Sequence, residues 1–253
     1  MDTQRTLVGT SGFSYKDWLG SFYPQFCPSA DFLRFYASIF ETVEIDSTFY
    51  RIPSAETVTK WQRQTPDGFV FAAKFPRTVT HEGKLDERLR SAGVFIEVMR
   101  RLGGKLGPLL LQFPYGFKPD SDDLLLRLMD GMPGDIPISV ELRNRKWLER
   151  EDILEAMRGR NMALCLIDHP WMPRLKVQTA DFSYIRFLGD RKKIENDFSY
   201  VRNERTEDLG WWREALAELA GPGRRQYVYF NNHYSGHAPS TASRFLEMIQ
   251  GRP

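Results

Sequence analysis

The chain alternates short, mostly apolar runs with longer segments in which apolar residues recur every three or four positions. Short apolar runs are typical of buried strands, and the longer periodicity is typical of amphipathic helices. The short runs predict eight strands, at residues 7–10, 42–46, 69–74, 106–113, 136–142, 162–167, 182–187 and 226–230. The periodic segments predict helices at residues 30–40, 54–64, 86–102, 121–129, 147–158, 207–219 and 240–249.

This order of elements predicts a parallel sheet built from repeated strand–helix units. About eight units of roughly 30 residues each match an α/β fold of one domain, a (β/α)8 TIM barrel over residues 1–253. A doubly wound open sheet is the main competitor, but it requires a glycine-rich fingerprint at its first strand–helix turn. Residues 9–12 read GTSG and lack that fingerprint. The sixth unit fits least well, because residues 168–180 show no helical pattern.

The composition is typical of a folded protein and by itself excludes few classes of function. The hydrophobic share is 42%, and the net charge of +2 is too small to argue for nucleic-acid binding by itself. Cys27 and Cys165 lack the spacing of metal ligands, so we expect reduced, packed thiols. The N-terminal residues lack the apolar core of a signal peptide, and no apolar run approaches the ~18 residues of a membrane span. We therefore expect a cytoplasmic protein with no membrane partner, of undetermined oligomeric state.

Residues 43–50, VEIDSTFY, are the most informative segment. Strand side chains alternate between two faces, so Val43 and Ile45 point one way and Glu44 and Asp46 the other. A face with two acids does not pack into an apolar core unless its charges are paired. We expect Glu44 and Asp46 to line a polar cavity or to belong to an ion-pair network.

Every predicted strand changes from apolar to polar residues at the same end. In a barrel, this carboxyl end carries the active site, so we expect a shared polar mouth. The polar residues at these ends are Ser11, Glu44, Asp46, Lys74, Gln112, Glu141, Arg143, Asp168, Arg186, Asn231 and Asn232. The alternative is that Glu141–Arg143 and Glu44–Lys74 are ion pairs that only hold the mouth together. Buried pairs are poor stabilising devices, because desolvation roughly cancels the attraction, so we favour a functional mouth.

Loop residues extend this prediction. His81 follows the third strand and is a candidate general acid or base; alternatively it caps a backbone group. Aromatic loop residues such as Tyr15, Tyr50 and Trp147 either pack or stack a flat ligand. The basic run at residues 190–193 is either solvated surface or part of a phosphate site, since barrels often bind phosphate in the loops after strands 7 and 8.

Two histidines after the eighth strand raise the question of a metal. His233 and His237 are four residues apart, a spacing that suits a metal only on a helix. The segment that carries them reads as a loop. We therefore predict no metal ligands and no cofactor, and a divalent metal remains as an alternative.

The same residues resemble a known family. Residues 8–15, VGTSGFSY, together with Trp18 and with residues 22–24 and 43–50, are similar to the YecE-like family, also called domain of unknown function 72. The similarity continues through Lys74, Thr80, His81, residues 112–114 and 141–143, Trp147, Arg186, residues 230–232 and Gly236. The resemblance implies a TIM barrel and no particular reaction. Three positions depart from it, because the family usually has Asn at Asp46, and often has His at Leu188 and Asn at Thr241.

We expect an enzyme that binds a small or extended polar ligand, anionic through phosphate or carboxylate, and performs acid/base chemistry of the hydrolase or lyase type. The candidate catalytic residues are Glu44, Lys74, His81, Glu141 and Asp168. The candidate ligand-binding residues are Ser11, Tyr15, Asp46, Tyr50, Gln112, Arg143, Trp147, Arg186, Asn231 and Asn232. Two alternatives stay open: a nucleic-acid phosphodiester-processing enzyme, which predicts a basic surface and a divalent metal, and a non-catalytic ligand-binding barrel.

Overall fold

The computed structural model describes residues 5–251, in which eight strands form one sheet in the order β1-β8-β7-β6-β5-β4-β3-β2. The strand pairs with a described register are all parallel. This order, with helices between most consecutive strands, confirms the predicted (β/α)8 barrel. The strands are β1 (Arg5–Thr10), β2 (Thr42–Ile45), β3 (Val70–Lys74), β4 (Leu106–Gln112), β5 (Ile138–Glu141), β6 (Ala163–Asp168), β7 (Phe182–Phe187) and β8 (Arg225–Phe230).

The predicted helices are all present, with ends displaced by a few residues. Between β6 and β7, residues 169–181 contain no helix, as the sequence pattern indicated. None of the helices within residues 5–251 is long and apolar enough to cross a membrane. The α-helices are α1 (Phe32–Ile39), α2 (Ala55–Gln64), α3 (Arg77–Thr80), α4 (Leu85–Met99), α5 (Asp122–Asp130), α6 (Glu151–Gly159), α7 (Thr206–Glu218), α8 (Asn232–Ser235) and α9 (Ala238–Gln250).

The segment after β8 corrects one prediction, because part of the expected loop is the short helix α8. The Asn231 side chain caps this helix by accepting a hydrogen bond from the His233 amide at 3.0 Å. Gly236 then ends the helix with a φ of 108°, a value that residues other than glycine rarely adopt. A helix of four residues is too short for its periodicity to show in the sequence.

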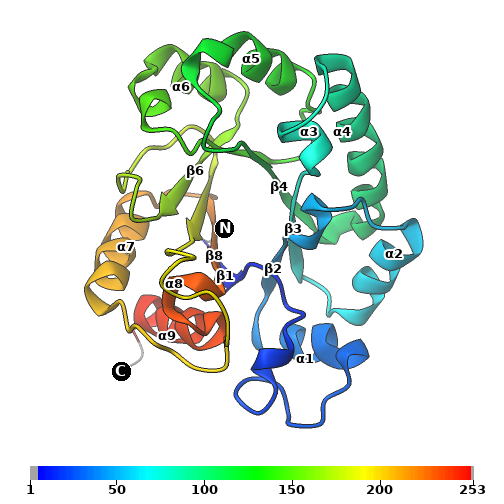
Figure 1. Ribbon diagram of the computed structural model, residues 1–253, viewed down its shortest axis with the longest axis vertical. Coiled ribbons are helices and arrows are strands. Elements are labelled where there is room, and N and C mark those ends of the chain that lie inside the picture. The colour runs from blue at the N-terminus through cyan, green and yellow to red at the C-terminus, as the bar shows by residue number, and fades with distance from the viewer. Residues whose placement is uncertain (1–4, 252–253) are drawn as a thin grey trace. The chain divides into compact units, whose positions relative to one another are not determined.

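The chain divides into two compact units. Unit 1 comprises Met1–Glu44, Leu166–Val177 and Phe182–Pro253, and unit 2 comprises Ile45–Cys165 and Gln178–Asp181. In unit 1, β8 pairs with both β1 and β7, and α9 lies along β1 and β8 beside α7 (Figure 1). Gly9 of β1 is required in this unit, because a Cβ there would overlap the Thr42 carbonyl oxygen.

In unit 2, strands β3, β4 and β5 pair in parallel, and α3 packs beside α4 (Figure 1). Lys74 is in register with Leu110, and Leu110 is in register with Ser139. One pleat further along, Gln112 is in register with Glu141. Residues in register share a face, as do residues two apart along one strand, so Lys74, Gln112 and Glu141 lie on one face of this sheet at its carboxyl end.

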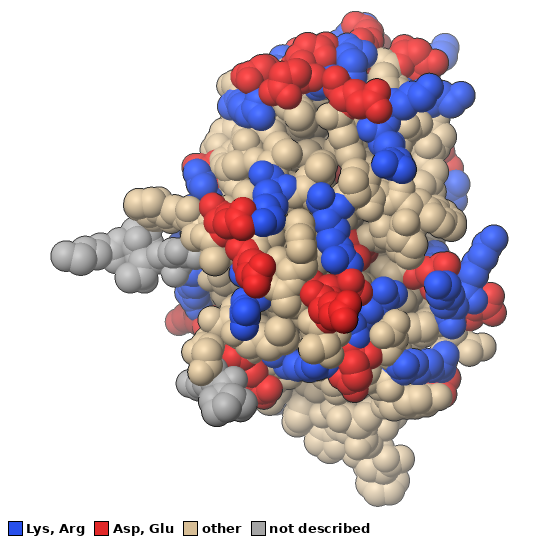
Figure 2. All heavy atoms as spheres, turned by 90° about the vertical axis from the view of Figure 1, so that its left-hand side faces the viewer, with Lys and Arg blue, Asp and Glu red and all other residues tan. Residues whose placement is uncertain are grey.

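Charged side chains of both signs are interspersed on the molecular face that Figure 2 shows. The surface ion pairs of the described residues include Arg158–Glu155 and Arg160–Asp130 in unit 2, and Lys176–Glu218 in unit 1. Exposed pairs of this kind contribute about 0–1 kcal/mol each, so they bear on solubility more than on the fold.

Candidate functional site

Glu44, at the end of β2 in unit 1, forms a buried cluster with two residues of β7. Arg186 donates a hydrogen bond from Nη2 to Glu44 Oε1 at 2.7 Å, and Tyr184 donates from Oη to Glu44 Oε2, also at 2.7 Å. The Arg186 and Glu44 side chains are 4% and 0% exposed. Burial, with the nearby Glu44 charge, raises the pKa of Tyr184 well above its usual value, so the phenol keeps its proton. Both oxygens of Glu44 are thus engaged, and the carboxylate holds Arg186 in place.

The backbone around β1 and a set of buried hydroxyl groups surround this cluster. Glu44 pairs with Ser11 in a parallel bridge, and the Glu44 carbonyl accepts a hydrogen bond from the Gly12 amide at 2.7 Å. Nearby, the hydroxyls of Thr42 and Tyr229 are 2.8 Å apart, and Tyr36 donates to the Thr42 carbonyl at 3.0 Å. Buried hydroxyls that find partners in this way make a rigid wall.

The buried side chains of Ser11 and Asn232 in unit 1 each carry a polar atom that lacks the hydrogen-bond partner a buried group normally has. Ser11 is 1% exposed and Asn232 is 2% exposed, yet Ser11 Oγ and Asn232 Nδ2 have no hydrogen-bond partner within residues 5–251. The amide orientation of Asn232 is fixed, because its Oδ1 accepts from Trp18 Nε1 at 3.2 Å and from the Ala238 amide at 3.0 Å. Buried donors without a partner are costly, and they point to a water molecule, an ion or a ligand.

Register places these two residues close together in the fold. Thr10 is in register with Phe230, and the Ser11 amide donates to the Phe230 carbonyl at 2.8 Å, so Ser11 lies next to the start of α8. Tyr15 donates from its hydroxyl to the Ser11 carbonyl at 3.2 Å, and its ring lies 4.7 Å from that of Trp18. Contacts therefore link Ser11, Tyr15, Trp18 and Asn232.

Asp168, another predicted catalytic residue of unit 1, contacts helices. Its Oδ2 accepts from Trp212 Nε1 of α7 at 2.7 Å and from the Tyr234 hydroxyl of α8 at 3.4 Å, and it pairs with Arg174 at 3.1 Å. Burial raises the pKa of Asp168, and Arg174 opposes that rise. These contacts anchor the helix-free segment after β6, and a catalytic role for Asp168 stays a prediction.

Unit 2 holds a second cluster, built around Phe49 in the turn after β2. Lys74 Nζ lies 3.7 Å from the centroid of the Phe49 ring, and the His81 ring lies 4.9 Å from that centroid in an edge-on arrangement. The His81 Nδ1 is 2.8 Å from the Thr80 hydroxyl. Burial lowers the pKa of His81 to about 4, helped by the positive charges of Lys74, Arg143, Arg77 and Arg88. His81 is therefore neutral at pH 7.

Glu141 and Arg143, at the end of β5, confirm one predicted ion pair. Arg143 Nε lies 2.5 Å from Glu141 Oε1, and the Glu141 side chain is 0% exposed whereas that of Arg143 is 17% exposed. Cys165 places its sulfur 3.8 Å from Glu141 Oε2, and the Arg143 guanidinium lies 5.0 Å from the Tyr115 ring centroid. In unit 1, Glu44 pairs with Arg186, and the suggested Glu44–Lys74 pair stays a prediction.

The remaining predicted residues differ in exposure. Tyr50 is 74% exposed, with its ring 5.3 Å from that of Phe49. Trp147 is fully buried; it donates from Nε1 to the Phe117 carbonyl at 2.9 Å and so supports its own loop. Gln112 is also buried, with Nε2 donating to the Phe113 carbonyl at 2.5 Å. Asp46 is half-buried at the start of the turn that carries Phe49.

Within residues 5–251, no group of three or more His, Cys, Asp or Glu side chains is arranged to hold a metal ion. His233 Nδ1 lies 2.6 Å from the Ile194 carbonyl. His237 Nδ1 accepts from the Ser240 amide at 3.3 Å, so the ring proton of the neutral form is on Nε2, 3.2 Å from the Ser21 hydroxyl. Burial lowers the pKa of His237 to about 4, and this tautomer cannot take a proton from Ser21.

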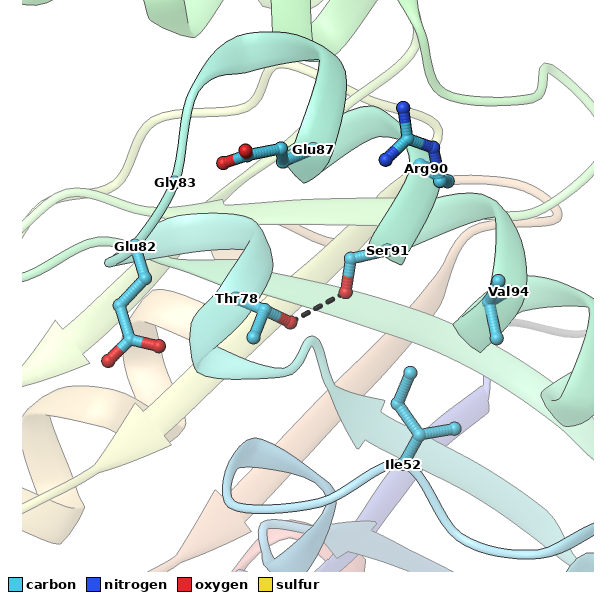
Figure 3. Close-up of a pocket in the computed structure, with 8 residues that line it drawn as sticks. All are labelled: Ile52, Thr78, Glu82, Gly83, Glu87, Arg90, Ser91 and Val94. Carbon is cyan, nitrogen blue, oxygen red and sulfur yellow. Dashed lines mark hydrogen bonds between the residues drawn. The ribbon is translucent and has the colours of Figure 1, made fainter.

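A separate hollow of about 510 Å³ lies on the outside of unit 2 (Figure 3). Ile52, Thr78 and Val94 line it, and Thr78 and Ser91 join α3 to α4 by a hydrogen bond of 2.6 Å (Figure 3). The side chain of Glu82 also borders it. No residue of the predicted site is among those that line this hollow.

Sequence reasoning missed several residues of the two clusters. Tyr184, Tyr229 and Tyr36 read as strand or helix core, because a buried tyrosine has the same pattern as a buried phenylalanine. Tyr115 stands in a predicted loop that is rich in aromatic residues, and that richness was the available signal, whereas Phe49 belongs to residues 43–50, which the sequence singled out. The convergence of Glu44, Lys74, Glu141, Asp168 and Arg186 on one cavity stays a prediction.

Comparisons with known proteins agree with this architecture. A family model described as "Protein of unknown function DUF72" matches residues 7–253. The chain is 27% identical to UPF0759 protein YunF of Bacillus subtilis (strain 168), over 96% of this chain and 94% of that protein. It is 28% identical to UPF0759 protein YecE of Escherichia coli (strain K12), over 65% of this chain and 69% of that protein.

Solved structures show the same fold. The crystal structure of a DUF72 family protein from Thermotoga maritima matches with a TM-score of 0.79 and 30% identity, over 98% of this chain and 100% of that one. A D-allulose 3-epimerase from Methylomonas sp. matches with a TM-score of 0.56 and 17% identity, over 99% of this chain and 98% of that one. At that identity, the likeness to the epimerase concerns the fold alone.

Proposed function

Since the chain belongs to the DUF72 family, described as of unknown function, we propose a function from its geometry: an enzyme that binds a phosphate- or carboxylate-bearing ligand beside Lys74, His81 and Arg143 and acts on it by acid/base catalysis. Hydrolysis or elimination suits these groups, because both reactions need a proton donor or acceptor next to an anion-binding site. The proposed site lies at the carboxyl ends of β3 and β5 in unit 2, where TIM barrels carry their active sites.

The observation that carries this proposal is the charge around His81. Its pKa is lowered by burial and by four cationic side chains, those of Lys74, Arg143, Arg77 and Arg88. Arg77 and Arg143 are paired with Glu82 and Glu141. Burial is the largest cause of the lowered pKa, and the four cations act in the same direction. A positive field around a neutral hydrogen-bonding ring is an environment that stabilises a bound anion.

Each of the three side chains has a distinct proposed role. Lys74, held over the Phe49 ring at 3.7 Å, and Arg143, held by Glu141 at 2.5 Å, bind the anionic group. His81 is neutral and directs Nδ1 to Thr80, so Nε2 is the nitrogen left to exchange a proton with the ligand. Glu141 serves as the alternative acid or base, although its Oε1 is engaged by Arg143.

Unit 1, taken by itself, holds two buried groups that could bind a ligand oxygen. Ser11 Oγ and Asn232 Nδ2 lack partners within the described residues, and both lie at the carboxyl end of β1 and β8. A ligand oxygen would satisfy either donor. In this account Glu44 keeps Arg186 oriented, and its own acid/base role remains a proposal.

The test is a turnover screen of phosphate monoesters and small carboxylic acids with the purified protein. For any substrate that is turned over, His81→Gln should lower kcat by about 10²–10⁴, the usual contribution of a general acid or base. His233→Gln is the matched control, because His233 is also half-buried but contacts the Ile194 carbonyl. Equal rates in His81→Gln and wild type would contradict the proposed role of His81.

A further inference from the structure

The exposed tyrosines Tyr50 and Tyr115 lie beside the proposed anion site of unit 2, which Lys74, His81 and Arg143 form. Single exposed apolar side chains are common, but aromatic rings gathered beside a cluster of polar side chains are typical of a ligand-binding site. Within unit 2, the exposed large hydrophobic residues are Tyr50 at 74%, Val94 at 53% and Tyr115 at 44%. Val94 borders the outer hollow, whereas both tyrosines contact the proposed site.

Contacts join each of the two rings to one of the proposed anion-binding side chains. The Tyr50 ring lies 5.3 Å from that of Phe49, which contacts Lys74 at 3.7 Å and His81 at 4.9 Å. On the other side, the Tyr115 ring lies 5.0 Å from the Arg143 guanidinium. The rings stand in the turns after β2 and β4, and the cations at the ends of β3 and β5.

We propose that the ligand of this site carries a planar aromatic ring next to its anionic group, and that Tyr50 or Tyr115 stacks against that ring while Lys74 and Arg143 hold the anion. This inference rests on the proposed function, because it assigns a substrate class to the same site. Aryl phosphates, mononucleotides and aromatic carboxylates share this chemistry. A tyrosine suits such a role, because it offers a large, rigid face at low conformational cost.

The test compares pairs of probes that differ by one ring. Phenyl phosphate is compared with inorganic phosphate, and benzoate with acetate, by calorimetric titration of the full chain. The ring should tighten binding about tenfold or more in the wild type, the gain expected of aromatic stacking. The gain should fall to about twofold or less in Tyr50→Leu, in Tyr115→Leu or in the variant that combines them. The gain should be retained when both tyrosines are replaced by phenylalanine (Tyr50→Phe with Tyr115→Phe), because the rings remain.

A matched control separates stacking from a general surface effect. Tyr200 of unit 1 is 55% exposed and lies 5.3 Å from the Arg202 guanidinium, much as Tyr115 lies by Arg143. Tyr200→Leu should leave the gain from the ring intact. If phosphate binds and the ring adds nothing, the aromatic substrate class is wrong while the anion site stands. If none of the four probes binds, the proposed function itself fails.

Discussion

Arg186 and Glu44 form an ion pair of 2.7 Å in which neither side chain is more than 4% exposed. Removing one partner of a buried pair leaves an uncompensated charge, which costs about 3–5 kcal/mol. We expect Glu44→Gln to lower the free energy of unfolding by about 3 kcal/mol, measured by urea denaturation with unchanged m-value. The double variant Glu44→Gln with Arg186→Met should regain part of that loss.

The control for this prediction is an exposed pair. Arg158 and Glu155 are 2.6 Å apart, but their side chains are 35% and 65% exposed. Glu155→Gln should change the free energy of unfolding by less than about 1 kcal/mol. A Glu44→Gln variant as stable as Glu155→Gln would show that the buried pair does not hold Arg186 in the way described.

Thr10 and Ser11, at the end of β1, carry two buried hydroxyl groups whose hydrogen bonding differs. Thr10 Oγ1 donates to the Gly12 carbonyl at 2.7 Å, whereas Ser11 Oγ has no partner within residues 5–251. We expect Thr10→Val to lower the free energy of unfolding by about 1–2 kcal/mol and Ser11→Ala to leave it unchanged or raise it slightly. Chemical denaturation measures both. A loss in Ser11→Ala equal to that in Thr10→Val would mean that the hydroxyl of Ser11 has a structural partner.

The fold was predictable because burial leaves a clear record in the sequence. Strands covered on both faces read as continuous apolar runs, and the polar residues that end them mark the carboxyl edge. The pairing of Glu44 was not predictable, because side-chain alternation gives the face of a residue but not its neighbour across the sheet. Lys74 was therefore one suggested partner for Glu44, and within unit 1 the Glu44 side chain pairs with Arg186.

The Asp168 prediction shows a second limit of sequence reasoning. A polar residue at the end of a strand can face either side of the sheet, and the pattern does not distinguish them. The Asp168 carboxylate accepts hydrogen bonds from Trp212 of α7 and from Tyr234 of α8. Its bonds to α7 and α8 depend on contacts between residues more than 40 positions apart, which no local pattern records.

His81 gives the protein a predictable response to pH. Its folded pKa of about 4 lies below the ordinary histidine value of 6.5, so the unfolded chain binds a proton first as pH falls. The contribution of His81 to stability should therefore be fully present above pH ~6.5 and be lost progressively down to pH ~4. The change in the free energy of unfolding between pH 7 and pH 5 should be smaller in His81→Gln than in the wild type, and an equal change in the two proteins would contradict this prediction.

Anion binding should reverse this shift. A bound anion stabilises the imidazolium, so it raises the pKa of His81 and takes up a proton. Sulfate is the suitable probe, because its own charge is constant in this range. Its affinity should rise roughly threefold or more from pH 7 to pH 5 in the wild type, and less in His81→Gln. Equal pH dependence in the two proteins would place the anion away from His81.

The most direct test of the central claim is calorimetric titration of inorganic phosphate into the wild type and three variants. Lys74→Met and Arg143→Gln remove the proposed anion ligands, and Lys60→Met removes an exposed lysine of α2 as the matched control. We predict that phosphate binds the wild type and Lys60→Met with the same Kd, and binds Lys74→Met and Arg143→Gln at least about tenfold more weakly. Equal affinity in all four proteins, or no binding to the wild type, would contradict an anion site at the end of β3 and β5.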